Sequence, residues 1–140
     1  MAVRLTVLAS GSKGNSAVVA SSRTRILVDA GISCRETFRR MKAAGENPAA
    51  LDAILITHEH SDHINGLPVL ARKLRIPVYM TAPTRSAWHR QLRAQRIELK
   101  GETKEETFQA GRTFGPESRR FQAYRLSPLG AMTSPLYTSN

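Results

Sequence analysis

Apolar and polar positions follow two different periods along the first hundred residues, and the periods predict alternating strands and helices. Short runs rich in β-branched residues predict strands, whereas apolar residues spaced by three and four predict amphipathic helices. Turn-forming residues separate these segments. Strands are expected at residues 3–9, 17–20, 25–28, 53–57 and 77–80, and helices at residues 34–44, 67–75 and 81–96.

Local signals support this order. Ser33 precedes the first expected helix and Glu36 follows three residues later, which matches a capping box. The strand at 53–57 is apolar except at its end, so we expect burial on both faces. Residues 102–106 are charged and are expected to form a turn or an edge segment. The alternation predicts an α/β architecture with ligands at the carboxyl ends of strands.

The periodic pattern weakens after about residue 98 and is lost from Gly115 onward. Pro116, Pro128 and Pro135 interrupt the last stretch, which has no clear period. We therefore predict that residues 1–114 form the folded part and that residues 115–140 form an irregular tail.

Charge is distributed unevenly along the 140 residues, whose net charge is +10. Residues 1–70 carry 8 basic and 6 acidic side chains, and residues 71–140 carry 13 and 5. This surplus favours acidic partners, nucleic acid above all, although a basic surface without any partner would look the same. The single cysteine, Cys34, allows no intrachain disulfide and fits a reducing cytoplasm, and no apolar run is long enough to span a membrane.

Residues 56–66, ITHEHSDHING, contain three of the four histidines. In an extended segment, His58, His60 and Asp62 project to one side, and a turn at His63 brings a fourth ligand to the same place. Glu59 then points away, and the zinc-protease pattern H-E-x-x-H is excluded because its fifth position is Asp62.

Imidazole and carboxylate donors suit zinc, and also manganese or iron. Four donors this close predict two divalent ions about 3.5–4 Å apart, one held by His58 and His60 and the other by Asp62 and His63. A water bridging the ions would be the nucleophile, and Asp62 would both bind a metal and orient that water.

Two further segments are candidates for phosphate contact. Backbone N–H groups in the turn at residues 11–16 could bind a phosphate through Ser12, Gly14 and Asn15, or the turn could simply join two strands. Basic side chains on the helix at 81–96 share one face and could follow a nucleic-acid backbone or be merely solvated. These side chains are Arg85, His89, Arg93 and Arg96.

The motif from Thr57 to His63 with Gly66, together with the segments LASGSKGNS and ILVDAG, resembles the YycJ/WalJ-type branch of the metallo-β-lactamase superfamily. The resemblance covers about residues 3–114. It implies the αββα sandwich of that family and a cytoplasmic, exonuclease-like hydrolase of phosphodiesters. Asp29 matches a family aspartate that lies behind the metal ligands, although a plain turn residue is the alternative.

The resemblance also implies ligands that the later sequence lacks. The family adds a histidine, a bridging aspartate and a final histidine, but no aspartate follows Asp62 and only His89 follows His63. The chain has about half the family's usual length, so only the N-terminal half of the sandwich is expected. One apolar sheet face would then be open and available for oligomerisation. A truncated or frameshifted product, with foreign sequence from about Gly115, would explain both features.

Three functions remain open at the level of sequence. The first is a metal-dependent hydrolase acting on DNA or another phosphodiester. The second is a basic nucleic-acid-binding module without catalysis, and the third is an inactive truncated fragment. Lactonase, thioesterase and nuclease chemistry share this histidine-rich loop, so the loop does not identify the substrate.

Overall fold

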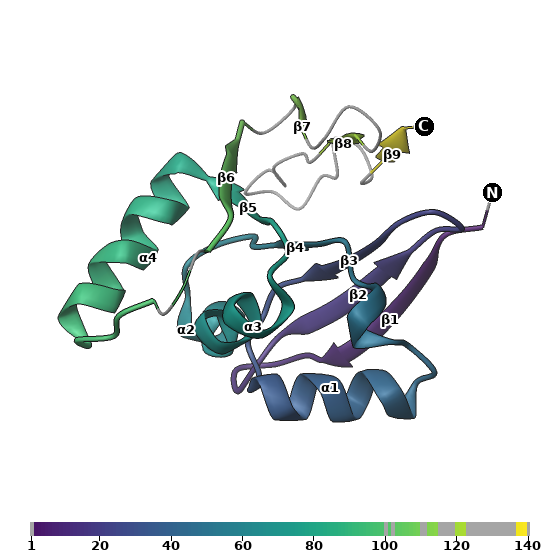
Figure 1. Ribbon diagram of the computed structural model, residues 1–140, viewed down its shortest axis with the longest axis horizontal. Helices are drawn as coiled ribbons and strands as arrows, with labels where there is room; N and C mark the ends of the chain where they lie inside the picture. The colour runs from purple at the N-terminus through teal and green to yellow at the C-terminus, as the bar shows by residue number, and fades with distance from the viewer. Residues whose placement is uncertain are drawn as a thin grey trace.

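The computed structural model of the chain describes residues 2–99, 101, 103–109, 112–114, 120–122 and 137–139. Helices and strands alternate in it as the sequence predicts (Figure 1). The strands are β1 (Arg4–Ala9), β2 (Ser16–Ala20), β3 (Arg25–Val28), β4 (Ala53–Leu55), β5 (Val78–Thr81), β6 (Glu105–Phe108), β7 (Thr113–Phe114), β8 (Arg120–Gln122) and β9 (Tyr137–Ser139). The helices are α1 (Cys34–Ala43), the 3₁₀ helix η1 (Pro48–Ala50), α2 (Ser61–Ile64), α3 (Leu67–Leu74) and α4 (Ala82–Ala94).

Six strands form one mixed sheet in the order β1-β2-β3-β4-β5-β6. The first three strands are antiparallel neighbours, and β3, β4, β5 and β6 run parallel. Val28 pairs with Leu55, and Leu55 pairs with Tyr79, so the carboxyl ends of β3, β4 and β5 lie side by side. The connections that follow these three strands therefore meet at the carboxyl ends, where open α/β sheets bind ligands.

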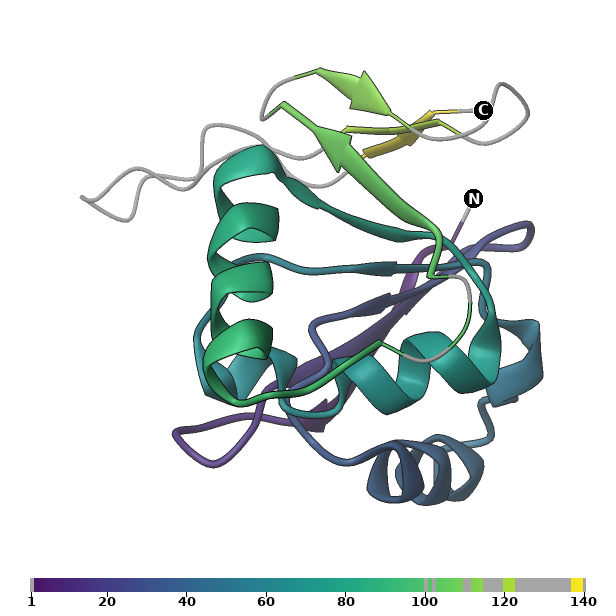
Figure 2. The ribbon, with the colours of Figure 1, turned by 60° about the vertical axis from the view of Figure 1, so that its left-hand side comes forward.

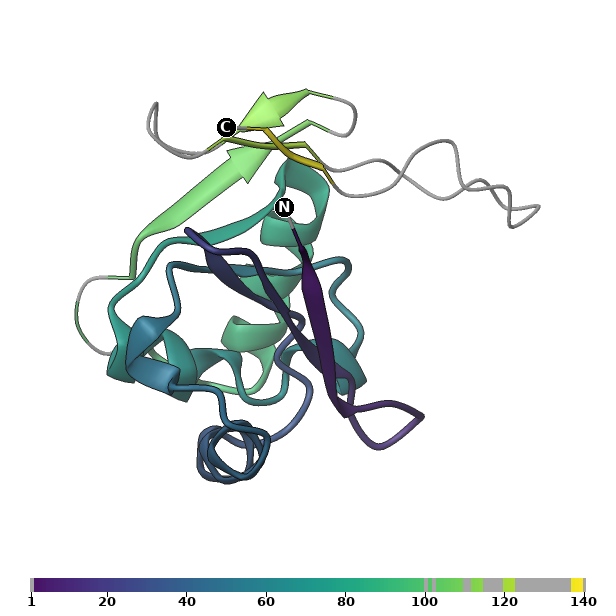
Figure 3. The same cartoon turned by 90° about the vertical axis from the view of Figure 1, so that its right-hand side faces the viewer.

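Helices cover one face of this sheet. Side chains from β2, β3, β4 and β5 form a single buried cluster with Met41 of α1, Leu70 of α3 and Trp88 of α4. In Figure 3, α1 is seen nearly end-on below the strands, on the side where this cluster lies. Figure 2 shows the short strands β7, β8 and β9 in a second sheet beyond β6.

The opposite face of the sheet carries a smaller apolar cluster, which includes Ile26, Leu55 and Tyr79. Cross-strand pairing places Leu5 and Val7 of β1 on this same face, because paired residues point the same way. Leu5 is 65% exposed and Val7 is 59% exposed. An open apolar sheet face was expected from the sequence, and these side chains form it. Oligomerisation through it stays a prediction.

Residues 102–106 were expected to form a turn or an edge segment, and the structure has the edge strand, because β6 begins at Glu105, pairs in parallel with β5 and is the last strand of the sheet. Two other local expectations differ from the structure. The strand expected at 53–57 ends at Leu55. Residues 61–64, expected to be extended up to Asp62, form the short helix α2.

Most of the predicted tail, residues 115–140, lies outside the described residues. Within it, β8 pairs antiparallel with β7 and with β9. The boundary at residue 114 stays a prediction. Among the described residues, no helix is long and apolar enough to span a membrane.

Candidate metal centre

Asp29 follows β3 in a left-handed backbone conformation, with φ of 62°, and its side chain is buried. This conformation costs a residue with a Cβ about 1–2 kcal/mol. The carboxylate offsets that cost, because it accepts hydrogen bonds from the Thr57 N–H at 2.8 Å, the Thr57 hydroxyl at 2.8 Å and His63 Nδ1 at 2.7 Å. Asp29 is therefore the point where the turn after β3 holds the histidine-rich loop.

The contact with Asp29 orients the ring of His63. Because Nδ1 donates to the carboxylate, Nε2 carries the free lone pair, and it lies 3.4 Å from Oδ2 of Asp62. A carboxylate behind the far nitrogen of a histidine is the arrangement that commonly fixes the tautomer of metal-binding histidines.

His58 has the same tautomer for a related reason. Its Nδ1 lies 2.9 Å from the Thr57 hydroxyl oxygen, whose only proton is directed to Asp29. Nδ1 is therefore the donor, and Nε2 is left as an acceptor. Burial, with smaller effects from His63 and His60, lowers the pKa of His58 below its ordinary value. A neutral imidazole is the form that binds metals.

The three imidazole rings of the loop lie in contact. The ring centroids of His58 and His63 are 3.8 Å apart, and those of His58 and His60 are 4.5 Å apart. His58 thus lies between His60 and His63, and Asp62 lies beside His63, while the role of these four residues as metal ligands stays a prediction. The geometry of the loop differs from the extended model, because extended backbone ends at His60 and the other two donors project from α2.

Asn15 holds Asp62 in place. Its Nδ2 donates to Asp62 Oδ2 at 2.9 Å, and its backbone N–H donates to the Asp62 carbonyl at 2.7 Å. Gly31 lies against the same carbonyl, and a Cβ on Gly31 would come within 1.8 Å of it. The turns at residues 11–16 and 29–32 thus pack directly on the backbone of α2, which explains why a glycine is needed at position 31.

The turn expected to bind phosphate is closed on itself. The Asn15 amide donates to the Gly11 carbonyl at 2.8 Å and accepts from the Gly11 N–H at 3.1 Å. Gly14 is buried against Ile32, while Ser12 is exposed. The main observed role of Asn15 is therefore to position Asp62. A phosphate contact through Ser12, Gly14 or Asn15 stays a prediction.

The chemical types of these donors suit a divalent metal, but their positions do not surround one ion. Two imidazoles present free Nε2 atoms, and that of His63 lies beside the Asp62 carboxylate, which is a donor set that suits zinc. Within the described part of the chain, however, no three His, Cys, Asp or Glu side chains are arranged to hold one ion. The rings lie against one another rather than around a common point.

Glu59 points away from these donors, as its position in the loop predicts. Its carboxylate accepts from the Thr84 hydroxyl at 3.3 Å, and its carbonyl accepts from Gln91 Nε2 at 3.0 Å. Both partners lie on α4, so this helix is attached directly to the loop. Trp88 and Leu92 of α4 are buried and belong to the core.

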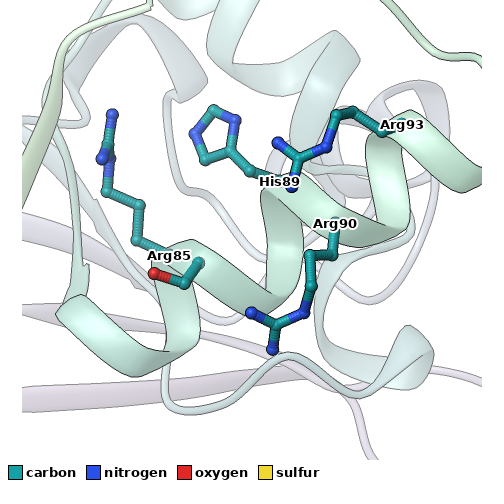
Figure 4. Close-up of a pocket in the computed structure, with 5 residues that line it drawn as sticks. Arg85, His89, Arg90 and Arg93 are labelled. Carbon is teal, nitrogen blue, oxygen red and sulfur yellow. The ribbon is translucent and has the colours of Figure 1, made fainter.

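The outward side of α4 is basic. Figure 4 shows side chains of Arg85, His89, Arg90 and Arg93, which with Ser86 line one open hollow of about 480 Å³. The sequence grouped Arg96 with this face, but Arg96 lies beyond the end of α4 in a left-handed conformation. Arg90, which the sequence did not indicate as part of this face, lines the hollow instead.

Comparisons with known proteins identify the family and the fold. Residues 9–132 match the sequence profile of the Metallo-beta-lactamase superfamily. The exodeoxyribonuclease YycJ of Bacillus anthracis is 48% identical over 87 residues, which are 62% of this chain and 33% of the relative. The exodeoxyribonuclease WalJ of Streptococcus pneumoniae is 47% identical over 81 residues, or 58% of this chain and 30% of the relative.

The fold comparison agrees. A metallo-β-lactamase from Cronobacter sakazakii superposes with a TM-score of 0.65 at 19% identity, covering 84% of this chain and 49% of that structure. The matches span about a third of each curated relative and half of the solved structure. The described residues thus form the N-terminal portion of this fold, and the matched segment resembles the YycJ/WalJ branch. The chain belongs to the metallo-β-lactamase superfamily.

Proposed function

We propose that the chain is a metal-dependent hydrolase of phosphodiesters, acting on nucleic acid through the loop at residues 58–63. One observation carries the proposal: Asp29 and Thr57 fix the tautomers of His63 and His58 so that both Nε2 atoms are free. The matched relatives named exodeoxyribonucleases support a nuclease-like reaction. Zinc is the first ion to test, and manganese is the second.

The loop residues would bind the metal ions in this proposal, and neighbouring residues would position them. His58, His60, Asp62 and His63 bind the metal ions, of which we propose two. A bound divalent ion would supply a water acidic enough to attack a phosphodiester near neutral pH. Asp62, held by Asn15, would also orient that water. Asp29 keeps His63 in the tautomer that binds metal.

Metal content and hydrolysis of the purified chain test this proposal. We expect the chain to retain zinc or manganese after dialysis and to hydrolyse bis(p-nitrophenyl) phosphate and linear DNA, with both reactions stopped by a chelator. His58→Ala with His60→Ala should abolish metal retention. His89→Ala removes a histidine that instead bonds Glu105, so its metal content should equal that of the wild type. Equal metal content in all three proteins would contradict the proposal.

The basic hollow on α4 favours a second candidate, a nucleic-acid-binding module without catalysis. That candidate predicts DNA binding that survives chelation, with no hydrolysis under any metal. An inactive fragment predicts instead poor solubility and weak metal retention. The same metal and hydrolysis measurements separate all three.

A further inference from the structure

The outward side of α4 differs from α1 in how its charge is balanced. In α1, Glu36 forms ion pairs with both Arg39 and Arg40 within the helix. The sequence of α4, from Ala82 to Ala94, contains three arginines and no acidic residue. Like charges spaced by three or four residues destabilise a helix. The charge on α4 therefore lacks the pairing expected of a face that serves only to be solvated.

Part of this charge is fixed by the neighbouring strand. Glu105 of β6 bonds Arg85, with Nε and Oε1 3.3 Å apart, and His89, with Nε2 and Oε1 2.5 Å apart. Among the described residues, Arg90 and Arg93 form no salt bridge, and both are exposed. Three guanidinium groups against one carboxylate leave the hollow with a net charge of +2 when His89 is neutral.

The spacing along α4 suits a repeating anion. Arg85, His89 and Arg93 follow one another at intervals of four residues, which is about 6 Å along a helix axis. Figure 4 shows His89 between the two arginines. This interval is comparable to the separation of successive phosphates on an extended nucleic-acid strand. Arginine also matches phosphate geometry, because its planar fork binds two oxygens at once.

The helix that carries the hollow, α4, is hydrogen-bonded to the histidine-rich loop. Glu59 stands between His58 and His60 and receives hydrogen bonds from Thr84 and Gln91 of α4. A strand lying on the outward side of α4 would therefore run beside the loop at a fixed distance from it. An acidic peptide would not explain the regular spacing, and a membrane would not explain the attachment.

We propose that Arg85, Ser86, His89, Arg90 and Arg93 form a binding site for the phosphodiester backbone of a nucleic-acid strand. The site deepens the proposed function, since it would lead the substrate past the loop. Binding itself does not require a metal, so the two proposals can fail separately.

The test compares two double variants of the full chain that lose the same charge. Arg90→Gln with Arg93→Gln removes exposed charges of the hollow, and Arg72→Gln with Lys73→Gln removes exposed charges of α3. Binding of a fluorescent single-stranded oligodeoxynucleotide is measured by anisotropy over a salt series, with chelator present to prevent cleavage. Circular dichroism shows whether each variant is folded.

We expect the wild type to bind with a strong dependence on salt. Loss of two phosphate contacts should reduce the slope of log K against log salt by about 1.4 in the α4 variant, and the α3 variant should keep the wild-type slope. Equal reductions in both variants would show general charge attraction and overturn the site, as would a wild type that binds no oligonucleotide. Binding only to anionic phosphatidylserine vesicles would also overturn it, in favour of a membrane surface.

Hydrolysis of bis(p-nitrophenyl) phosphate distinguishes failure of this site from failure of the proposed function. This small ester has no extended backbone, so its hydrolysis by the wild type reports on the loop at residues 58–63 and not on α4. Salt-dependent binding that α4 variants weaken, in a chain that hydrolyses no ester, would leave the site standing and refute the hydrolase.

Discussion

Replacing Asp29 tests whether its carboxylate orients His63 in the candidate metal centre. Asp29→Asn keeps a side chain that tolerates the left-handed conformation, with φ of 62°, so the backbone cost stays small. The amide retains one acceptor oxygen for the Thr57 N–H, but its NH₂ group now faces a donor. His63 Nδ1 then loses a charged acceptor at 2.7 Å.

A hydrogen bond to a charged group contributes about 1.5–3 kcal/mol, so we expect Asp29→Asn to lower the free energy of unfolding by about 2 kcal/mol. Removing the carboxylate behind a metal-binding histidine typically lowers metal affinity 10–100-fold. Urea titration measures the first effect through a shifted midpoint at constant slope, and zinc titration against a competing chelator measures the second.

Asp52→Asn is the matched control for this experiment. Asp52 also accepts a hydrogen bond from a backbone N–H, that of Arg25 at 2.9 Å, but at the opposite end of the parallel strands. An amide oxygen can replace that acceptor, so we expect a loss of less than about 1 kcal/mol and unchanged zinc affinity. If Asp29→Asn weakens zinc binding no more than Asp52→Asn does, Asp29 does not orient His63 for a metal.

Further substitutions at Asn15 and Gly31 examine how the turns hold α2. Asn15→Ala removes the donor to Asp62 Oδ2 and should weaken zinc binding. Asn15→Asp should also place a second negative charge beside Asp62, so urea titration at low salt should show a lower stability than that of Asn15→Ala. Equal stability of the two variants at all salt concentrations would contradict this contact. Gly31→Ala should prevent folding or cost more than about 3 kcal/mol, because its Cβ would overlap the Asp62 carbonyl. Gly45→Ala is the control, with φ of 77° and open space around the added Cβ, and it should cost only about 1–2 kcal/mol. A Gly31→Ala protein as stable as the Gly45→Ala protein would refute the packing of Gly31 on α2.

The elements of the fold were accessible from local sequence, since periodicity and capping act over a few residues. The pattern at 53–57 predicts a buried strand, and Ser33 with Glu36 predicts the start of α1, where the Ser33 hydroxyl accepts from the Glu36 N–H. The position of Glu105 was not accessible, because a short charged segment becomes a strand only when a neighbouring strand supplies its hydrogen bonds.

The sequence by itself determined which side chains are candidates, because four metal-binding residues, three histidines and one aspartate, stand within six positions and are kept close together by the short chain between them. Tertiary structure alone decided how they are held. His63 meets Asp29 across 34 residues and Asp62 meets Asn15 across 47, through turns brought together where parallel strands end. Tertiary structure also decided which side chains of α4 are paired. Strand pairing between β5 and β6 places Glu105 beside Arg85 and His89, although Glu105 is far from them along the chain.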